Sequence, residues 1–416
     1  MSAAHAVPVA VVTGLLLVAW ADAAQSKQTL MVNPPIEARI TPLMRPVMAG
    51  QPVEFAGDAS VGKISRYSWD FGDGDTASGP KARHSFAKPG IYKVTLTVSD
   101  GQYTDPCLAI VRAHTAETLH IPQVVLDTDQ KNEVDDQHYT AYAVFGELDV
   151  LGENSVHHGG GQEEINYREI LHMLDLAKQS GAPAHRIPFV FRGADQPLAV
   201  PASRDWRDTR SVTTEASEAI LAAARGASPS NPVWAVPVGP GTNVACAVLQ
   251  ARIEGLDLKD RLRVMWLGGS DHAITGEFNG NNDPWGTYVV TQSGLQMWIM
   301  PAPVGGRLRM DKRTESDLYP ENPLGQYLRE ITPARSKSLF DPTCLAAIIS
   351  ERLGLGWVKE FEPVTVAGPD GGYRWTKTDD PTTVRVIRQI DQDAMKADVF
   401  GTMKGKPTRL IGVPPP

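Results

Sequence analysis

The pattern of hydrophobic and polar positions changes once along the chain, at about residues 113 to 121. Before this point apolar and polar residues alternate in short runs, such as Val53-Glu54-Phe55, Arg66 to Trp69 and Ile91 to Val98, separated by clusters of Gly, Asp and Pro. Alternation places every second side chain on one face of a strand, and the clusters supply turns. We therefore expect a β-sandwich of short antiparallel strands over residues 25–113.

Beyond about Ile121 continuous apolar runs alternate with helical segments. Apolar residues recur at spacings of three and four in Ile165 to Ala177 and Asn243 to Ile253, as on the buried side of a helix. Continuous runs are typical of strands covered on both faces, and they occur at residues 124–126, 189–191, 233–238, 264–267 and 297–300. The chain should close with a helix at 344–353, short strands at 364–367, 373–375 and 384–387, and a helix at 389–403. This order predicts an α/β fold with a doubly wound, mostly parallel sheet over residues 114–416.

Length and charge narrow the class of protein. A chain of 416 residues with 42% hydrophobic residues is long enough for two domains, each with its own core. We therefore expect a chain shortened to begin near His114 to fold without the sandwich. The formal net charge of -8 leaves no basic surplus for a phosphate backbone, which argues against a nucleic-acid partner.

The N-terminus has the pattern of a signal peptide. Val7 to Trp20 is almost wholly apolar and is followed by Ala21-Asp22-Ala23, a cleavage site of small residues. We expect residues 1–24 to be removed, the protein to be secreted or periplasmic, and the mature chain to have no membrane span. Three scattered cysteines, at 107, 246 and 344, indicate buried thiols, and one bridge stays open as an alternative.

Carboxylates gather directly after the first strand of the predicted sheet. Asp127 and Asp129 end this strand, and Asp135 and Asp136 open the next helix. Four carboxylates within ten positions repel one another unless a cation lies among them. Helix capping explains one of these residues but not all four. The cluster therefore predicts a metal site, and oxygen ligands in this number suit Ca²⁺ best.

Two family resemblances follow from motifs. Trp69-Asp70-Phe71-Gly72-Asp73-Gly74, with Lys88-Pro89-Gly90-Ile91-Tyr92 and Val98-Ser99-Asp100-Gly101, resembles PKD domains. The resemblance implies a spacer or adhesive role, with an extracellular polysaccharide or protein as the partner. The second unit resembles the nucleoside hydrolase family, in which an Asp-x-Asp strand end runs into an Asp-Asp helix start. Later landmarks of that family appear in order: Gly239 to Asn243, Leu267-Gly268-Gly269, Glu277-Phe278-Asn279 with Asp283-Pro284, and Leu339 to Pro342.

The resemblance implies a role for each matching residue. Asp129, Asp136 and Asp341 would be side-chain metal ligands, together with the carbonyl oxygen of Thr242. Asp129 would also be the base that takes a proton from a metal-activated water, which then attacks the anomeric carbon. The sugar hydroxyls would be held by Asp135, Glu277 and Asn279, and Asn154 is a candidate for one further contact. The implied activity is metal-dependent hydrolysis of the N-glycosidic bond of a ribonucleoside or related riboside.

Several positions depart from the family pattern. The acidic loop is two residues longer, and it resembles an exported branch in which this loop reads Asn-Glu-x-Asp-Asp. Phe340 stands where some members have a histidine that helps the leaving base depart. His157, His158 and His272 are candidates to replace it, although each also has a plain reading as a loop histidine.

An alternative function stays open at this point. The missing histidine and the attached sandwich fit an extracellular carbohydrate-binding protein that kept the fold and lost turnover, or an enzyme for another glycoside. The retained acidic residues favour the enzyme. The sequence leaves the aglycone and the oligomeric state undetermined.

Overall fold

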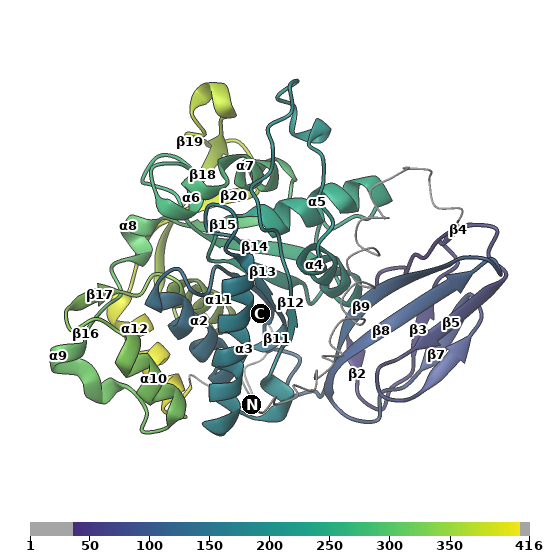
Figure 1. The fold of residues 1–416 in the computed structure, drawn as a ribbon, viewed down its shortest axis with the longest axis horizontal. Coiled ribbons are helices and arrows are strands. Elements are labelled where there is room, and N and C mark those ends of the chain that lie inside the picture. The colour runs from purple at the N-terminus through teal and green to yellow at the C-terminus, as the bar shows by residue number, and fades with distance from the viewer. Residues whose placement is uncertain (1–35, 408–416) are drawn as a thin grey trace, which may run out of the picture.

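The N-terminal unit is a sandwich of mostly antiparallel strands, shown in purple and blue in Figure 1. The structure is a computed structural model, which describes residues 36–407, so the predicted signal peptide lies outside the described residues. Phe55, Trp69, Phe71 and Phe86 are buried and pack their rings against one another. One sheet has the order β2 (Val47–Met48), β9 (Thr104–His114), β8 (Gly90–Ser99), β5 (Arg66–Asp70), β6 (Thr76–Ser78). The other strands pair as β3 (Val53–Ala56) with β7 (Lys81–His84) and β1 (Ile36–Glu37) with β4 (Val61–Gly62).

The second unit is organised around one nine-stranded sheet. Its order is β12 (Phe189–Phe191), β11 (Asp149–Ser155), β10 (Gln123–Thr128), β13 (Val233–Pro237), β14 (Leu262–Leu267), β15 (Gln296–Met300), β20 (Val384–Ile390), β18 (Val358–Val366), β19 (Trp375–Lys377). All pairs from β12 to β20 are parallel, and β18 and β19 add an antiparallel edge. The predicted α/β class is confirmed. The strand order reverses between β10 and β13, and ligands bind at such a switch point in doubly wound sheets.

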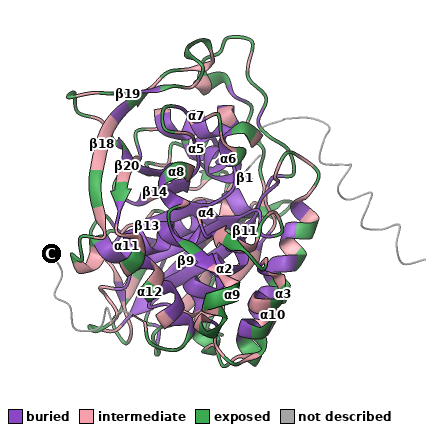
Figure 2. Cartoon of the chain, turned by 90° about the vertical axis from the view of Figure 1, so that its left-hand side faces the viewer, coloured by how far each residue is buried: buried purple, intermediate pink, exposed green. Residues whose placement is uncertain are grey.

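Helices cover both faces of this sheet. One face carries α2 (Val134–Phe145), α3 (Glu163–Gln179), α10 (Pro323–Ile331), α11 (Pro342–Leu353) and α12 (Gln392–Met403); the other carries α4 (Glu215–Gly226), α5 (Thr242–Glu254) and α7 (Pro284–Gln292). Figure 2 shows central strands such as β13 and β14 as buried, whereas the edge strand β18 carries intermediate and exposed residues. Val124 and Leu126 point into one core and Val125 into the other, which explains the continuous apolar runs.

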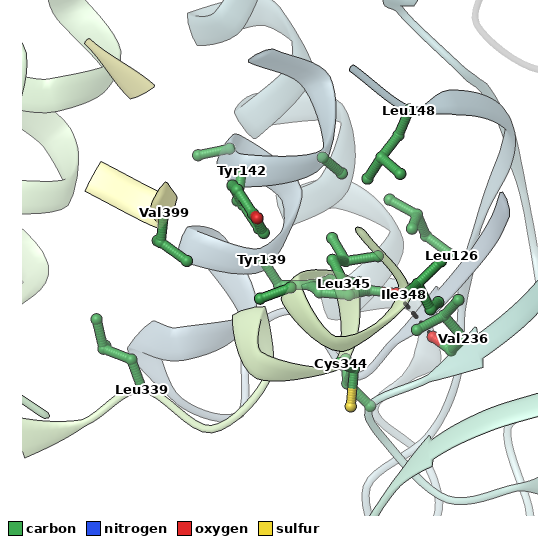
Figure 3. Packing of buried hydrophobic residues seen from close by; sticks show 14 of the residues in the cluster. Leu126, Tyr139, Tyr142, Leu148, Val236, Leu339, Cys344, Leu345, Ile348 and Val399 are labelled. Atoms are coloured by element: carbon green, nitrogen blue, oxygen red, sulfur yellow. Dashed lines mark hydrogen bonds between the residues drawn. The ribbon is translucent and has the colours of Figure 1, made fainter. Parts of the chain in front are cut away.

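Shorter elements complete the chain at the edges of the sheet. They are α6 (Phe278–Asn282), α8 (Ala302–Gly305), α9 (Lys312–Glu315), and the hairpin of β16 (Arg309–Asp311) with β17 (Ser336–Ser338). Short 3-10 helices lie at Ala184–Arg186, Trp206–Asp208, Ser316–Leu318 and Pro369–Gly371. In the core beneath α2 and α11, the Tyr139 hydroxyl donates to the Val236 carbonyl at 2.7 Å (Figure 3). No helix among residues 36–407 combines the length and hydropathy needed to cross a bilayer.

The two units share an extensive interface, in which α4 packs along β9 of the sandwich. Ile110 of β9 belongs to the same core as α4 and α5, and its carbonyl lies so close to Gly226 that no side chain fits there. Arg225 donates to the Leu108 carbonyl at 3.2 Å, and Arg112 pairs with Asp149 at 2.8 Å. The sandwich is therefore packed against the α/β unit through buried polar and apolar contacts.

Candidate active site

A cavity of about 350 Å³ opens at the carboxyl edge of the sheet, beside the switch point between β10 and β13. Segments that are far apart in the sequence meet there: the loop after β10, the start of α2, the ends of β13 and β14, α6 and the start of α11. Its lining includes Asp129, Asn132, Glu133, Asp135, Asp136, Val238, Leu267, Glu277, Phe278, Asn279, Phe340 and Asp341. This lining combines carboxylates and two side-chain amides with the phenyl rings of Phe278 and Phe340, so the cavity suits a ligand with both polar and apolar parts.

Four carboxylates occupy the floor of this cavity. Asp129 follows β10, Asp135 and Asp136 lie in the first turn of α2, and Asp341 directly precedes α11. Each of the four is at most 3% exposed. One oxygen atom from each of Asp135, Asp136 and Asp341 can be chosen so that all three lie within 4.8 Å of one another. Carboxylates from two helix starts thus lie close enough together to share one cation, and Asp129 at the strand end lines the same cavity.

This arrangement strongly disfavours the ionised carboxylates. Burial, followed by the charges of its neighbours, raises the pKa of Asp136 to about 7, and burial raises that of Asp135 to about 6 despite the nearby Lys337. The pKa values of Asp129 and Asp341 rise further for the same reasons. Among the described residues, Asp129 Oδ2 and Asp135 Oδ1 are buried without a hydrogen-bond partner. Orphaned oxygens and mutual repulsion both fit a site for a divalent cation.

Neighbouring groups hold the carboxylates in place. Thr128 Oγ1 donates to Asp136 Oδ1 at 2.7 Å, and the Phe340 amide donates to Asp135 Oδ2 at 3.1 Å. Lys337 Nζ lies 3.7 Å from Asp135 Oδ1 and also pairs with Glu133. Lys337 is a site residue that the sequence does not predict, because a lone lysine in a three-residue strand gives no periodic or motif signal.

Glu277 and Asn279 form the opposite wall. Glu277 caps α6, where its carboxylate accepts from the amides of Asn279 at 2.7 Å and Gly280 at 3.1 Å, and from Gly269 at 2.6 Å. Asn279 Nδ2 donates to the carbonyls of Val238 at 2.6 Å and Leu267 at 3.1 Å. These bonds fasten α6 to the ends of β13 and β14 and face both residues toward the carboxylates.

Two predicted site residues lie deeper, behind the cavity lining. Asn154 Nδ2 is 3.5 Å from Asp127 Oδ2, which also accepts from Asn243 Nδ2 at 3.0 Å. Asp127 is thereby separated from the other aspartates, and burial raises its pKa to about 8. Thr242 is the first residue of α5, and its hydroxyl donates to Asp283 Oδ2 at 2.7 Å. Asp341, distant in sequence, takes the fourth position in the carboxylate cluster.

The three candidate histidines have different surroundings. His157 is fully buried and contacts Thr242 Oγ1 through Nε2 at 2.9 Å. His272 is exposed in the loop after β14. His158 is half-buried, and its ring centroid lies 6.5 Å from that of Phe278, which lines the cavity.

Two protein families match this chain, one for each unit of the structure. Residues 124–397 match the sequence profile of the family described as inosine-uridine preferring nucleoside hydrolase, and residues 32–113 match that of the PKD domain. A purine-preferring ribonucleoside hydrolase from Gardnerella vaginalis superposes with a TM-score of 0.53 at 18% identity, covering 68% of this chain and 98% of that one. A plant nucleoside hydrolase, PpNRh1, gives a TM-score of 0.52 at 18% identity, covering 68% and 99%. Identities this low establish the fold alone.

The curated relatives match a shorter part of the chain. Collagenase ColA from Clostridium perfringens is 42% identical over 57 residues, which are 13% of this chain and 5% of the collagenase. A microbial collagenase from Vibrio alginolyticus is 35% identical over 91 residues, 20% of this chain and 11% of that protein. This chain therefore spans about a tenth or less of the length of these two relatives.

Proposed function

Because the chain belongs to the inosine-uridine preferring nucleoside hydrolase family, we propose that it hydrolyses the N-glycosidic bond of ribonucleosides or related ribosides. The observation that carries this proposal is the cavity floor, where Asp129, Asp135, Asp136 and Asp341 converge opposite Glu277 and Asn279. A floor of carboxylates suits a reaction in which positive charge develops on a sugar ring. The facing amide and carboxylate suit ring hydroxyls, which need hydrogen-bond partners.

The family is metal-dependent, and the chain offers a matching ligand set. We propose that Asp129, Asp136 and Asp341, with the Thr242 carbonyl, hold Ca²⁺. Support comes from the buried, unpartnered Asp129 Oδ2, from the closeness of Asp136 and Asp341, which together with Asp135 can bring one oxygen atom each within 4.8 Å of the others, and from the preference of Ca²⁺ for oxygen ligands. The bound cation would offset the repulsion among the carboxylates and lower the pKa of water at the site.

The side chains divide the remaining work. Asp129 accepts a proton from the attacking water, since its Oδ2 atom is buried in the site without a hydrogen-bond partner of its own. Asp135, Glu277 and Asn279 hold sugar hydroxyls. Asn154 lies behind them and contacts Asp127 near the end of β10. As the C–N bond breaks, its electron pair leaves with the base, and the cluster stabilises the oxocarbenium-like ring.

A panel of nucleosides tests this function. The purified protein, supplied with Ca²⁺, should release reducing sugar and free base from at least one ribonucleoside, and a chelator should abolish the release. Binding of ribosides without release in the presence of Ca²⁺ would contradict the proposal, and would support the alternative of a carbohydrate-binding protein.

We also propose that the protein is exported and that its mature chain begins after residue 24. The apolar run from Val7 to Trp20 and the small residues that follow support this. The mature chain would then consist of the sandwich, residues 25–113, and the hydrolase unit, residues 114–416. The intact mass of protein recovered from the cell exterior or periplasm should lack residues 1–24.

A further inference from the structure

The residues assigned so far include no hydrogen-bond donor for the leaving base. A purine or pyrimidine departs with an electron pair, and a hydrogen-bond donor near the base stabilises the charge that develops there. Phe340 lines the cavity beside Asp341 and has no proton to offer. A donor must therefore come from another segment, and the histidines are the natural candidates.

Two of the three histidines are unsuited to this role. His157 uses Nε2 against the Thr242 hydroxyl at 2.9 Å, and its Nδ1 accepts from the Gly159 amide at 3.2 Å. Both of its ring nitrogens are thus engaged inside the protein. His272 is exposed, and its loop is held through backbone contacts with Trp375.

The hydrogen bonds around Asn166 assign the tautomer of His158. Asn166 Oδ1 accepts from the Lys131 amide at 2.9 Å, so this atom is the amide oxygen. The other atom, Nδ2, carries two protons: one is donated to the Val156 carbonyl at 2.7 Å and the second faces His158 Nδ1 at 3.2 Å. Nδ1 therefore accepts, and the neutral imidazole carries its proton on Nε2. Burial lowers the pKa of His158, which favours the neutral form of the ring.

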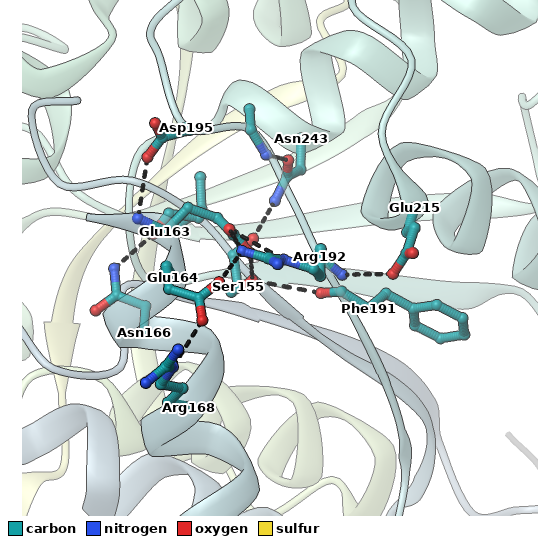
Figure 4. Close-up of polar contacts among 12 residues, drawn as sticks. Ser155, Glu163, Glu164, Asn166, Arg168, Phe191, Arg192, Asp195, Glu215 and Asn243 are labelled. Atoms are coloured by element: carbon teal, nitrogen blue, oxygen red, sulfur yellow. Dashed lines mark hydrogen bonds and ion pairs between the residues drawn. The ribbon is translucent and has the colours of Figure 1, made fainter. Parts of the chain in front are cut away.

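The loop that carries His158 is held firmly at its base. The Asn243 amide donates to the Ser155 carbonyl at 2.9 Å, and Ser155 Oγ donates to Glu163, which pairs with Arg192 (Figure 4). At its far end, the Gly161 amide donates to the Asp195 carbonyl at 2.9 Å. Asn166 also holds the acidic loop through Lys131, so one buried side chain fixes both loops relative to each other.

We propose that His158 is the hydrogen-bond donor to the leaving base. Asn166 Nδ2 donates to its Nδ1 at 3.2 Å, which leaves the ring proton on Nε2, and its ring centroid lies 6.5 Å from that of Phe278, which lines the cavity. The inference rests on the proposed function. In the step, the C–N bond breaks and its electron pair goes to the base, while the attacking water forms the new C–O bond and gives its proton to Asp129. His158 Nε2–H donates a hydrogen bond to the departing base, which then takes its proton from solvent.

A comparison of two substrates isolates this role. The His158→Ala variant should lose about 100-fold in kcat on inosine, in the range expected for one acid or base group. On p-nitrophenyl riboside, whose leaving group departs without help, it should stay within about 3-fold of wild type, as this role predicts. His272→Ala is the matched control and should leave both rates unchanged. Equal losses on the two substrates, or no loss on inosine, would overturn the proposal.

The tautomer supplies a readout that does not depend on turnover. In ¹⁵N-histidine-labelled protein, the side-chain NMR signals of His158, identified by their loss in His158→Ala, should show the proton on Nε2. A proton on Nδ1 would overturn the assignment. If the wild type hydrolyses no riboside, the proposed function is refuted. If the wild type is active but His158→Ala slows inosine and p-nitrophenyl riboside equally, only this inference is refuted.

Discussion

The interface between the two units makes a quantitative prediction about Arg112. This residue lies on β9 of the sandwich, and its Nε is 2.8 Å from Asp149 Oδ1 at the start of β11. The two side chains are 8% and 10% exposed, so water screens the pair poorly. The variant Arg112→Met keeps much of the apolar stem and removes the charge.

The expected loss of stability in Arg112→Met comes from the Asp149 carboxylate, which stays buried without its partner. Without Arg112, the Asp149 carboxylate is buried with less positive charge nearby, and burial already raises its pKa. Removing one partner of a buried ion pair costs about 3–5 kcal/mol in the free energy of unfolding, because the remaining charge is uncompensated. Changing Asp149 to Leu in the same protein should recover most of this loss. The exposed Arg66 is the matched control, and Arg66→Met should change stability by less than about 0.5 kcal/mol.

Equilibrium unfolding in urea, followed by tryptophan fluorescence, measures these differences. The buried tryptophans Trp69 and Trp234 report on the sandwich and on the hydrolase unit, respectively. We expect a single transition in the wild type, with the midpoint shifted to lower urea in Arg112→Met. A loss below about 1 kcal/mol in Arg112→Met would refute the reasoning that the pair is desolvated and couples the two units.

Three further predictions follow from the structure. Asp136→Ala and Asp341→Ala should each lose Ca²⁺ binding in calorimetric titration, and wild-type affinity in both variants would remove the proposed metal site. Because burial raises the pKa values of Asp135 and Asp136 to about 6 and about 7, the contribution of these two groups to the stability of the metal-free protein should be fully present below about pH 4 and should be lost as the pH rises through 6 to 7. Ca²⁺ should therefore raise Tm more at pH 8 than at pH 5, and a pH-independent effect of Ca²⁺ would contradict this. A chain shortened to begin at His114 should be insoluble or markedly destabilised. It loses Ile110 from the hydrolase core, the Leu108 carbonyl that accepts from Arg225, and Arg112, which pairs with Asp149. If circular dichroism shows that the shortened chain is as stable as the wild type, the two units fold independently, as first expected.

The fold class was predictable because each unit has a simple pattern of apolar residues: alternation in the sandwich, and continuous runs between helical segments in the hydrolase unit. Alternation in Ile91 to Val98 indicated an antiparallel strand, and the continuous run at 124–126 indicated a strand buried on both faces. The strand β9 was not predicted. Alternate residues from Cys107 to Ala113 belong to the sandwich core, whereas Ile110 on the opposite face belongs to the hydrolase core, so both faces of the strand are buried and its pattern is not that of one isolated unit.

The candidate site was predicted where residues lie close in sequence. The loop from Asp129 to Asp136 and the segment from Glu277 to Asn279 reach the same cavity as whole motifs. Contacts between distant segments could not be read from spacing. Lys337 reaches Asp135 across about two hundred residues, and Asn166 reaches His158 and Lys131 from a helix that has no motif of its own.

The most direct test of the account is the rate at which hypoxanthine appears from inosine, measured by chromatography with wild type and Asp129→Asn side by side. We predict Ca²⁺-dependent release by the wild type, loss of that release after chelation, and its return when Ca²⁺ is restored. Asp129→Asn should show no release under any of these conditions, because it lacks the base. Release that survives both chelation and the Asp129→Asn change would contradict the account.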